Sequence, residues 1–126
     1  MSQMKFRELN HVAIHVANVE TSCHFYREVL KMEALARPAF DFPGAWFRLG
    51  TRQELHLIGD RQLPVHSHNR GNHFALLVDD VAPWEKHLQQ AAYPFRSKLR
   101  PDGARQLFLA DPDGHVIEIC SPPPTA

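Results

Sequence analysis

Four side chains that can bind a metal ion recur at one constant spacing in this chain of 126 residues. His11 and His73 lie 62 residues apart, and the same offset separates His56 from Glu118. Two copies of one unit, each with one ligand near its first strand and another on its last, can bring all four to one centre if they pack pseudo-symmetrically. The spacing therefore predicts a metal site built from both copies.

The sequence around these residues repeats as well. NHVAIHVANV (10–19) is similar to NHFALLVDDV (72–81), and ELHLIG (54–59) is similar to VIEICS (116–121). Repetition at a fixed offset indicates two copies of one supersecondary unit that share a core. A chain of this length fits one domain, so we predict a single domain over 1–126.

The first copy predicts the order strand, helix and three strands. Alternating β-branched residues in HVAIHV indicate a strand, and Asn18 or Thr21 is a suitable N-cap for the helix that follows. The predicted strands are 11–16, 32–36, 45–50 and 54–58, and the predicted helix is about 21–31.

The second copy repeats this order after a polar linker over 59–71. Pro83 suits the first turn of its helix, and DPDG (111–114) is a tight-turn signal before the last strand. The predicted strands are 73–78, 93–99, 105–110 and 115–120, and the helix ends near 92. The fold class is thus α+β, with pseudo-symmetric βαβββ units at about 6–58 and 72–121.

Strand alternation places the candidate ligands on one face. His11 and His15 share a face opposite Val12 and Ile14, and His56 points away from Leu55 and Leu57. Glu118 lies between two isoleucines that should pack against a helix, so its carboxylate points to the opposite face. A carboxylate in that place is destabilising unless it is paired or coordinated.

Composition narrows the class of partner. The formal net charge is zero with histidine neutral, which gives no electrostatic footprint for nucleic acid or membrane. No apolar run approaches the roughly 20 residues of a membrane span, and the first residues lack the apolar core of a signal peptide. We therefore expect a cytoplasmic protein with a small-molecule substrate or a protein partner. Cys23 and Cys120 are expected to be reduced, and His66 and His68 to lie in a solvated loop.

LNHVAIHV (9–16), FYREVL (25–30), NHFALLVDDV (72–81) and DPDGHVIEI (111–119) together resemble the vicinal oxygen chelate superfamily. This superfamily includes glyoxalase I, extradiol dioxygenases, fosfomycin-resistance thiol transferases and methylmalonyl-CoA epimerase. The resemblance covers about residues 9–121. It implies paired βαβββ units that form a cup-shaped mixed sheet (the glyoxalase-like fold) around one divalent metal ion. It also implies a homodimer, often with the metal site shared across the interface.

The resemblance carries the ligand roles onto His11, His73 and Glu118. Two imidazoles and one carboxylate suit Fe, Mn, Zn, Ni or Co and leave positions open for substrate oxygens. His56 stands where the glyoxalase and epimerase branches carry Glu or Gln as a fourth ligand. Three roles for His56 remain open: metal ligand, catalytic acid or base beside the metal, and structural hydrogen-bonding group. Glu118 and His56 are the candidate catalytic residues.

Four further residues are candidates for the substrate pocket. His15 shares the face of His11, and Trp46 or Phe47 together with Phe108 can supply an apolar wall. Arg48 either faces the pocket, where it would meet an anionic substrate, or lies on the surface.

A metal that chelates two vicinal oxygens acts as a Lewis acid, and a nearby group moves the proton. A glyoxalase-like lyase or isomerase is therefore our first prediction, and an extradiol-type Fe(II) dioxygenase is the alternative. A thiol transferase fits less well, because Ala13 stands where that branch has a hydroxyl residue and no arginine follows Glu118. A non-enzymatic binding protein, as in bleomycin resistance, is a further class, but those relatives lack the ligands retained here.

Overall fold

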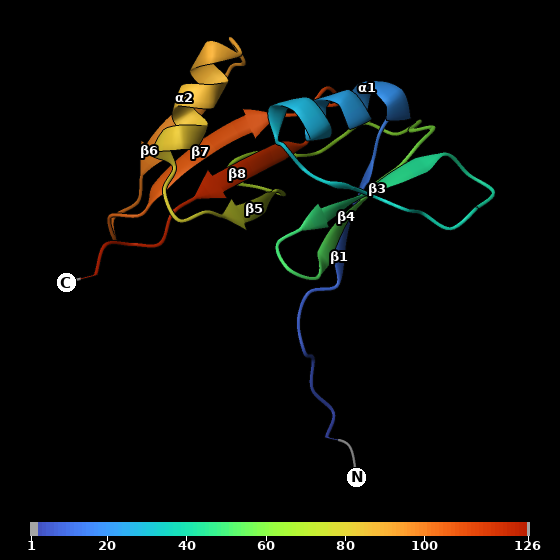
Figure 1. Cartoon of the computed structure of the whole chain (residues 1–126), viewed down its shortest axis with the longest axis horizontal. Helices are drawn as coiled ribbons and strands as arrows, with labels where there is room; N and C mark the ends of the chain where they lie inside the picture. The colour runs from blue at the N-terminus through green and yellow to red at the C-terminus, as the bar shows by residue number, and fades with distance from the viewer. Residues whose placement is uncertain (1–2, 126) are drawn as a thin grey trace.

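The computed structural model describes residues 3–125, which form two four-stranded mixed sheets with helices beside them (Figure 1). The first unit contains β1 (His11–His15), α1 (Val19–His24), the π-helical turn η1 (Phe25–Val29), β2 (Ala34–Leu35), β3 (Gly44–Leu49) and β4 (Gln53–Ile58). The second contains β5 (Phe74–Leu77), α2 (Ala82–Gln90), β6 (Arg96–Leu99), β7 (Arg105–Ala110) and β8 (Val116–Cys120). The predicted α+β class and the two βαβββ units are confirmed.

Both sheets have the same topology, which confirms the internal repeat. Their strand orders are β1-β4-β3-β2 and β5-β8-β7-β6, and in each the first strand runs parallel to the last. Ala13 is paired with His56 in the first sheet, and Ala75 is paired with Glu118 in the second. His56 and Glu118 therefore hold equivalent positions in their sheets.

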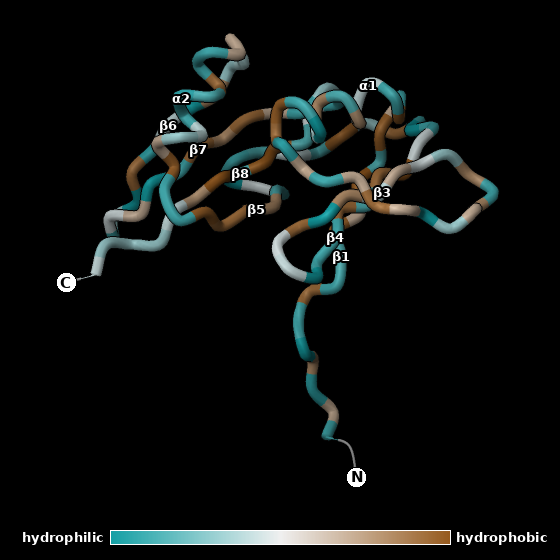
Figure 2. Tube along the Cα trace, in the orientation of Figure 1, coloured by the Kyte–Doolittle hydropathy of each residue, from teal (hydrophilic) through white to brown (hydrophobic). Residues whose placement is uncertain are grey.

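Strand alternation separates a packed face from a polar face in both units. Leu55, Leu57, Ile117 and Ile119 are all almost fully buried in one apolar core that spans both units. Figure 2 shows hydrophobic stretches along β5 and β7 of the second sheet, and a mixture of hydrophilic and hydrophobic residues along α2. The packing of these residues fixes which face of each sheet carries the polar side chains.

The first helix begins earlier than predicted and ends in a wider turn. Asn18 is its N-cap, because its side chain accepts a hydrogen bond from the Thr21 amide, so the helix starts at Val19. Its last turn is π-helical, with the Leu30 amide donating to the Phe25 carbonyl at 3.2 Å. This widening turns two aromatic side chains, Phe25 and Tyr26, into the core.

Two strands are shorter than predicted because the chain leaves each helix through hydrogen bonds to that helix. The Met32 amide donates to the Tyr26 carbonyl, so β2 is restricted to Ala34–Leu35. The Tyr93 amide donates to the Leu88 carbonyl in the same way, and β6 begins only at Arg96.

The DPDG turn of the second unit is held by the first unit and by the linker that follows it. Asp111 accepts a hydrogen bond of 2.7 Å from the buried Tyr26 hydroxyl, and Asp113 accepts from the Ala17 amide and from Arg61, each at 2.9 Å. Both carboxylates are almost fully buried. We call these five residues the inter-unit clasp. Burial and the neighbouring Asp111 carboxylate raise the pKa of Tyr26, which keeps its hydroxyl protonated as a donor.

Two further expectations concern the cysteines and the absence of a membrane span. Cys23 and Cys120 are both free thiols, as predicted, and burial raises the pKa of each. No helix between residues 3 and 125 is both long enough and apolar enough to cross a bilayer.

We predict that Tyr26→Phe lowers the free energy of unfolding by about 1–3 kcal/mol, because it leaves a buried carboxylate oxygen of Asp111 without its donor. Urea unfolding at pH 7 measures the change. Tyr93→Phe is the matched control, since it removes an exposed hydroxyl that donates to the Ala110 carbonyl. Equal losses in the two variants would show that the clasp does not depend on this hydrogen bond.

Candidate metal centre

The second unit brings two of the predicted ligands together. His73 Nε2 lies 3.0 Å from Glu118 Oε1, and the other carboxylate oxygen accepts a hydrogen bond of 3.0 Å from the Gln106 side chain. Glu118 is only 6% exposed although it lies on the polar face of the sheet. The predicted need for a compensating partner is thus met by an imidazole and an amide.

The hydrogen bonds of His73 suit a metal ligand. Its Nδ1 lies 3.1 Å from the Gly71 carbonyl, which can only accept, so this nitrogen carries a proton. A neutral ring then presents a lone pair at Nε2 to the carboxylate of Glu118. Two lone pairs at this distance repel each other. The contact between His73 Nε2 and Glu118 Oε1 is therefore favourable only if Nε2 also carries a proton or if both atoms bind one cation. Ligand atoms at about 2.0–2.2 Å from one metal ion lie about 3 Å apart, which agrees with the observed separation.

The first unit forms a second pair from the other two predicted ligands. The rings of His11 and His56 are stacked with centroids 4.1 Å apart. His11 Nδ1 lies 2.8 Å from Asn10 Oδ1, which leaves Nε2 for a ligand bond. An oxygen thus orients His11 as another orients His73, and such partners typically fix the tautomer of metal-binding histidines.

His56 differs from the other histidines because a carboxylate holds it. Its Nε2 lies 2.9 Å from Glu54 Oε1. Its two ring faces are covered by His11 and by Trp46, and the Trp46 ring is nearly parallel to it at a centroid distance of 4.1 Å. These contacts fix the orientation of the imidazole and commit Nε2 to Glu54. Nδ1 is the ring nitrogen left for a substrate or a metal.

The two pairs belong to different sheets and do not converge within one chain. Among residues 3–125, no cluster of three or more His, Cys, Asp or Glu side chains is arranged to hold a metal ion. Each unit therefore presents half of the predicted ligand set. We call His11 with His56 the first half-site and His73 with Glu118 the second half-site.

The predicted pocket residues divide into two groups. Trp46 and Phe108 occupy equivalent positions of the repeat and contact His56 and His73 respectively, at centroid distances of 4.1 and 5.8 Å. Phe47, the alternative to Trp46, is buried in the core on the opposite face.

The other two predicted pocket residues are bound to neighbouring groups. His15 donates from Nε2 to the Gly59 carbonyl at 2.9 Å. Arg48 lies on the same face of the sheet as Trp46. It donates a hydrogen bond to the Thr51 carbonyl and lies 3.9 Å from Glu33.

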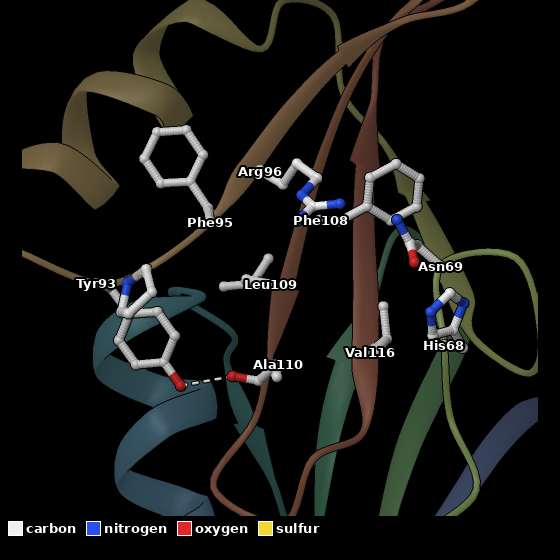
Figure 3. Close-up of a pocket in the computed structure, with 10 residues that line it drawn as sticks. His68, Asn69, Tyr93, Phe95, Arg96, Phe108, Leu109, Ala110 and Val116 are labelled. Carbon is white, nitrogen blue, oxygen red and sulfur yellow. Dashed lines mark hydrogen bonds between the residues drawn. The ribbon is translucent and has the colours of Figure 1, made fainter.

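An open depression of about 500 Å³ extends along β7 and β8 beside the second half-site (Figure 3). Arg96, Phe108 and Val116 line it from the sheet, and His68 and Asn69 line it from the segment between the units. Figure 3 shows the Arg96 guanidinium directed toward Phe108. A cation thus lies beside the aromatic wall.

Sequence reasoning did not identify Glu54 and Gln106 as site residues. Glu54 lies two positions before His56 in one strand, so strand alternation could have placed it on the same face. Gln106 reaches Glu118 from the neighbouring strand, and its identification requires the register of β7 against β8.

Comparison with known proteins gives one family. The family described as the Glyoxalase/Bleomycin resistance protein/Dioxygenase superfamily matches residues 8–119. Glyoxylase I 4 of Arabidopsis thaliana is 32% identical over 122 residues, covering 90% of this chain and 70% of its own length. Glutathione transferase FosA of Serratia marcescens is 29% identical over 116 residues, covering 90% of this chain and 79% of its own length.

Solved structures share the fold. A protein assigned to the glyoxalase family from Bacillus anthracis superposes with a TM-score of 0.83 at 23% identity, covering 95% of this chain and 98% of its own. Lactoylglutathione lyase from Agrobacterium tumefaciens superposes with a TM-score of 0.73 at 20% identity, covering 90% of this chain and 92% of its own.

We predict that Glu118→Gln weakens zinc binding by at least about a hundredfold, because losing an outer-shell partner of a ligand already costs roughly 10–100-fold. His11→Ala and His73→Ala should also lose metal while the fold is retained. Competition with a chromophoric chelator measures the affinity, and circular dichroism checks the fold. Glu85→Gln, on α2, is the control variant. Zinc affinity unchanged in all three ligand variants would exclude this site.

Proposed function

Because the chain belongs to the Glyoxalase/Bleomycin resistance protein/Dioxygenase superfamily, as its resemblance to vicinal oxygen chelate proteins predicted, we propose a metal-dependent enzyme of the glyoxalase-like lyase or isomerase type. The observation that carries the proposal is the His73–Glu118 contact on the polar face of a cup-forming sheet. An oriented imidazole and a buried carboxylate at ligand spacing are what a divalent metal ion requires.

His11, His73 and Glu118 are the proposed ligands. Each of the two histidines has Nδ1 bound to an oxygen, from Asn10 or from Gly71, which leaves Nε2 as the nitrogen that would bind the metal. A divalent ion bound there would act as a Lewis acid toward two vicinal oxygens of the substrate. The aromatic side chains Trp46 and Phe108 would exclude water beside those oxygens.

We place the complete site between two chains of a homodimer. Its two halves lie on separate sheets and do not meet within one chain. β1, which carries His11, and β5, which begins directly after His73, are both edge strands of their sheets. Unpaired strand edges favour association with another chain. Leu77 at the end of β5 is 72% exposed, which suits contact with a second chain. In a symmetric dimer the first half-site of each chain meets the second half-site of its partner.

His56 is assigned as the group that moves the proton. The Glu54 carboxylate fixes its tautomer and orientation, much as an acidic residue orients a catalytic histidine. This assignment leaves three ligands and more than one open position on the metal, which chelation of two substrate oxygens needs. Lactoylglutathione lyase, one of the structural neighbours, provides the precedent for the reaction class.

An extradiol-type dioxygenase is the second candidate. With His56 held by Glu54, the remaining set of two histidines and one carboxylate is the facial arrangement that also suits Fe(II). Iron in protein purified without added metal, together with oxygen uptake on addition of a catechol, would favour this reading over the lyase or isomerase.

The shared site is tested by mixing two inactive parents. We predict that His11→Ala and Glu118→Gln homodimers each lack tight zinc sites, and that refolding them together restores roughly a quarter of all sites. Half of the random dimers are mixed, and each mixed dimer contains one intact site of two. Native mass spectrometry confirms mixing while bound zinc is counted. Mixed dimers that recover no zinc would place the site within one chain.

The reaction and the role of His56 are tested together. Metal-loaded protein should convert the thiol adduct of a 2-oxoaldehyde into a 2-hydroxy thioester, with one proton lost from the aldehyde carbon and one gained at the neighbouring carbon. We expect His56→Ala to abolish thioester formation while retaining zinc, and Glu54→Gln to lower the rate by about 10²–10⁴-fold. Thioester absorbance and elemental analysis are the measurements.

Glu85→Gln again serves as the control variant in this experiment. Loss of zinc from His56→Ala would identify a ligand, and full activity would leave His56 a structural residue. If wild-type protein with bound zinc converts no adduct of a panel of 2-oxoaldehydes and thiols, the lyase or isomerase assignment fails.

A further inference from the structure

We propose that the substrate carries a planar aromatic group beside its metal-chelating oxygens. The proposal rests on the proposed function, since it assigns the substrate class of the same site. It is carried by a continuous series of rings that extends from the first half-site to the surface.

The series, which we call the aromatic column, consists of His11, His56, Trp46, Phe40 and Phe42. The centroid distances between successive rings are 4.1, 4.1, 6.0 and 5.2 Å. The first two contacts are stacked, with interplanar angles of 15° and 5°. The column thus begins at a proposed metal ligand and leads away from it.

The outer end of the column is exposed and is contacted by an arginine. Phe40 and Phe42 are 46% and 40% exposed, and both lie in the loop between β2 and β3. The Arg37 guanidinium lies 4.8 and 4.9 Å from their ring centroids and donates to the Phe42 carbonyl at 2.9 Å. The Arg37 contacts hold the two phenyl rings at the surface of this loop. The loop therefore presents a preformed apolar contact surface.

The opposite half of the completed cup is also aromatic. Phe108 is the repeat equivalent of Trp46 and contacts His73 edge-on at 5.8 Å. Arg96 is paired with Phe108 across β6 and β7, and Lys98 Nζ lies 5.9 Å from the same ring. Figure 3 shows Arg96 beside Phe108. In the proposed dimer, a planar substrate between Trp46 and Phe108 would have an aromatic wall on both sides and the two cations at its margin.

These walls favour a flat ring over a saturated group of the same size. Aromatic rings gain affinity from offset-stacked and edge-on contacts beyond the area they bury. A saturated ring buries a similar area without that contribution. The column therefore predicts a preference that depends on planarity and not only on hydrophobicity.

The test compares three 2-oxo acids that share one chelating head: phenylglyoxylate, cyclohexylglyoxylate and pyruvate. Isothermal titration of the zinc-loaded protein gives their dissociation constants. We expect phenylglyoxylate to bind about tenfold more tightly than pyruvate and about fivefold more tightly than cyclohexylglyoxylate. Trp46→Leu and Phe40→Leu should bring the phenyl to cyclohexyl ratio close to one. Phe6→Leu, which removes a fully exposed phenyl ring away from the column, should leave it unchanged.

A second measurement reports directly on the column. The chain has two tryptophans, so Trp84→Phe leaves Trp46 as the sole indole. Phenylglyoxylate should change Trp46 emission in this variant, and pyruvate should change it far less. Zinc is the metal of choice because it does not quench fluorescence.

Three results would overturn the proposal: no binding of phenylglyoxylate, equal affinity for the phenyl and cyclohexyl acids, or a preference that survives both column variants. Each is distinct from failure of the proposed function. Zinc stoichiometry and the mixed-dimer experiment test the site itself, and they do not depend on which acid binds.

Discussion

The inter-unit clasp is the constraint on which the position of each half-site depends. Asp113 has a nearly buried carboxylate that is neutralised by Arg61 and also bound by the Ala17 amide, while Asp111 binds the Tyr26 hydroxyl. A buried carboxylate without such partners would cost several kcal/mol, so separating the units is strongly opposed. The clasp joins the turn before β8 to the helix side of the first unit. It therefore fixes the units through their packed faces and leaves the polar faces free for other contacts.

Within each unit, the half-site is a consequence of strand alternation against one core. Burial of Ile117 and Ile119 at 0% and 1% exposure forces Glu118 onto the other face, where His73 and Gln106 offset the cost of desolvating its carboxylate. A one-residue slip of β8 would move the isoleucines out of the core and turn Glu118 inward. The core residues thus determine the position of the proposed ligands on the polar face.

The sequence was sufficient to predict what repeats and what alternates. The offset of 62 residues predicted equivalent positions for His56 and Glu118, and the sheet registers agree. The boundaries of β2 and β6 were not predictable, because they depend on hydrogen bonds that the helix exits make after folding. The separation of the two half-sites in one chain was not predictable either, since it depends on how the two units pack against each other. The contact between Glu54 and His56 was not predicted, although strand alternation alone places both side chains on one face.

The differences between the two copies indicate how the duplicated unit became specialised. Where the second unit has the DPDG turn, the first has Leu49-Gly50-Thr51-Arg52, so only one copy supplies the carboxylates of the clasp. Where the second unit has Glu118, the first has His56, whose carboxylate partner Glu54 lies two residues earlier in the same strand. In the proposed shared site, the two different half-sites would supply one ligating carboxylate, that of Glu118, and the Glu54 carboxylate would act only through the His56 imidazole. Two first half-sites would lack a carboxylate ligand, and two second half-sites would lack His56. Only the mixed pairing combines a carboxylate ligand with an oriented proton-transfer group.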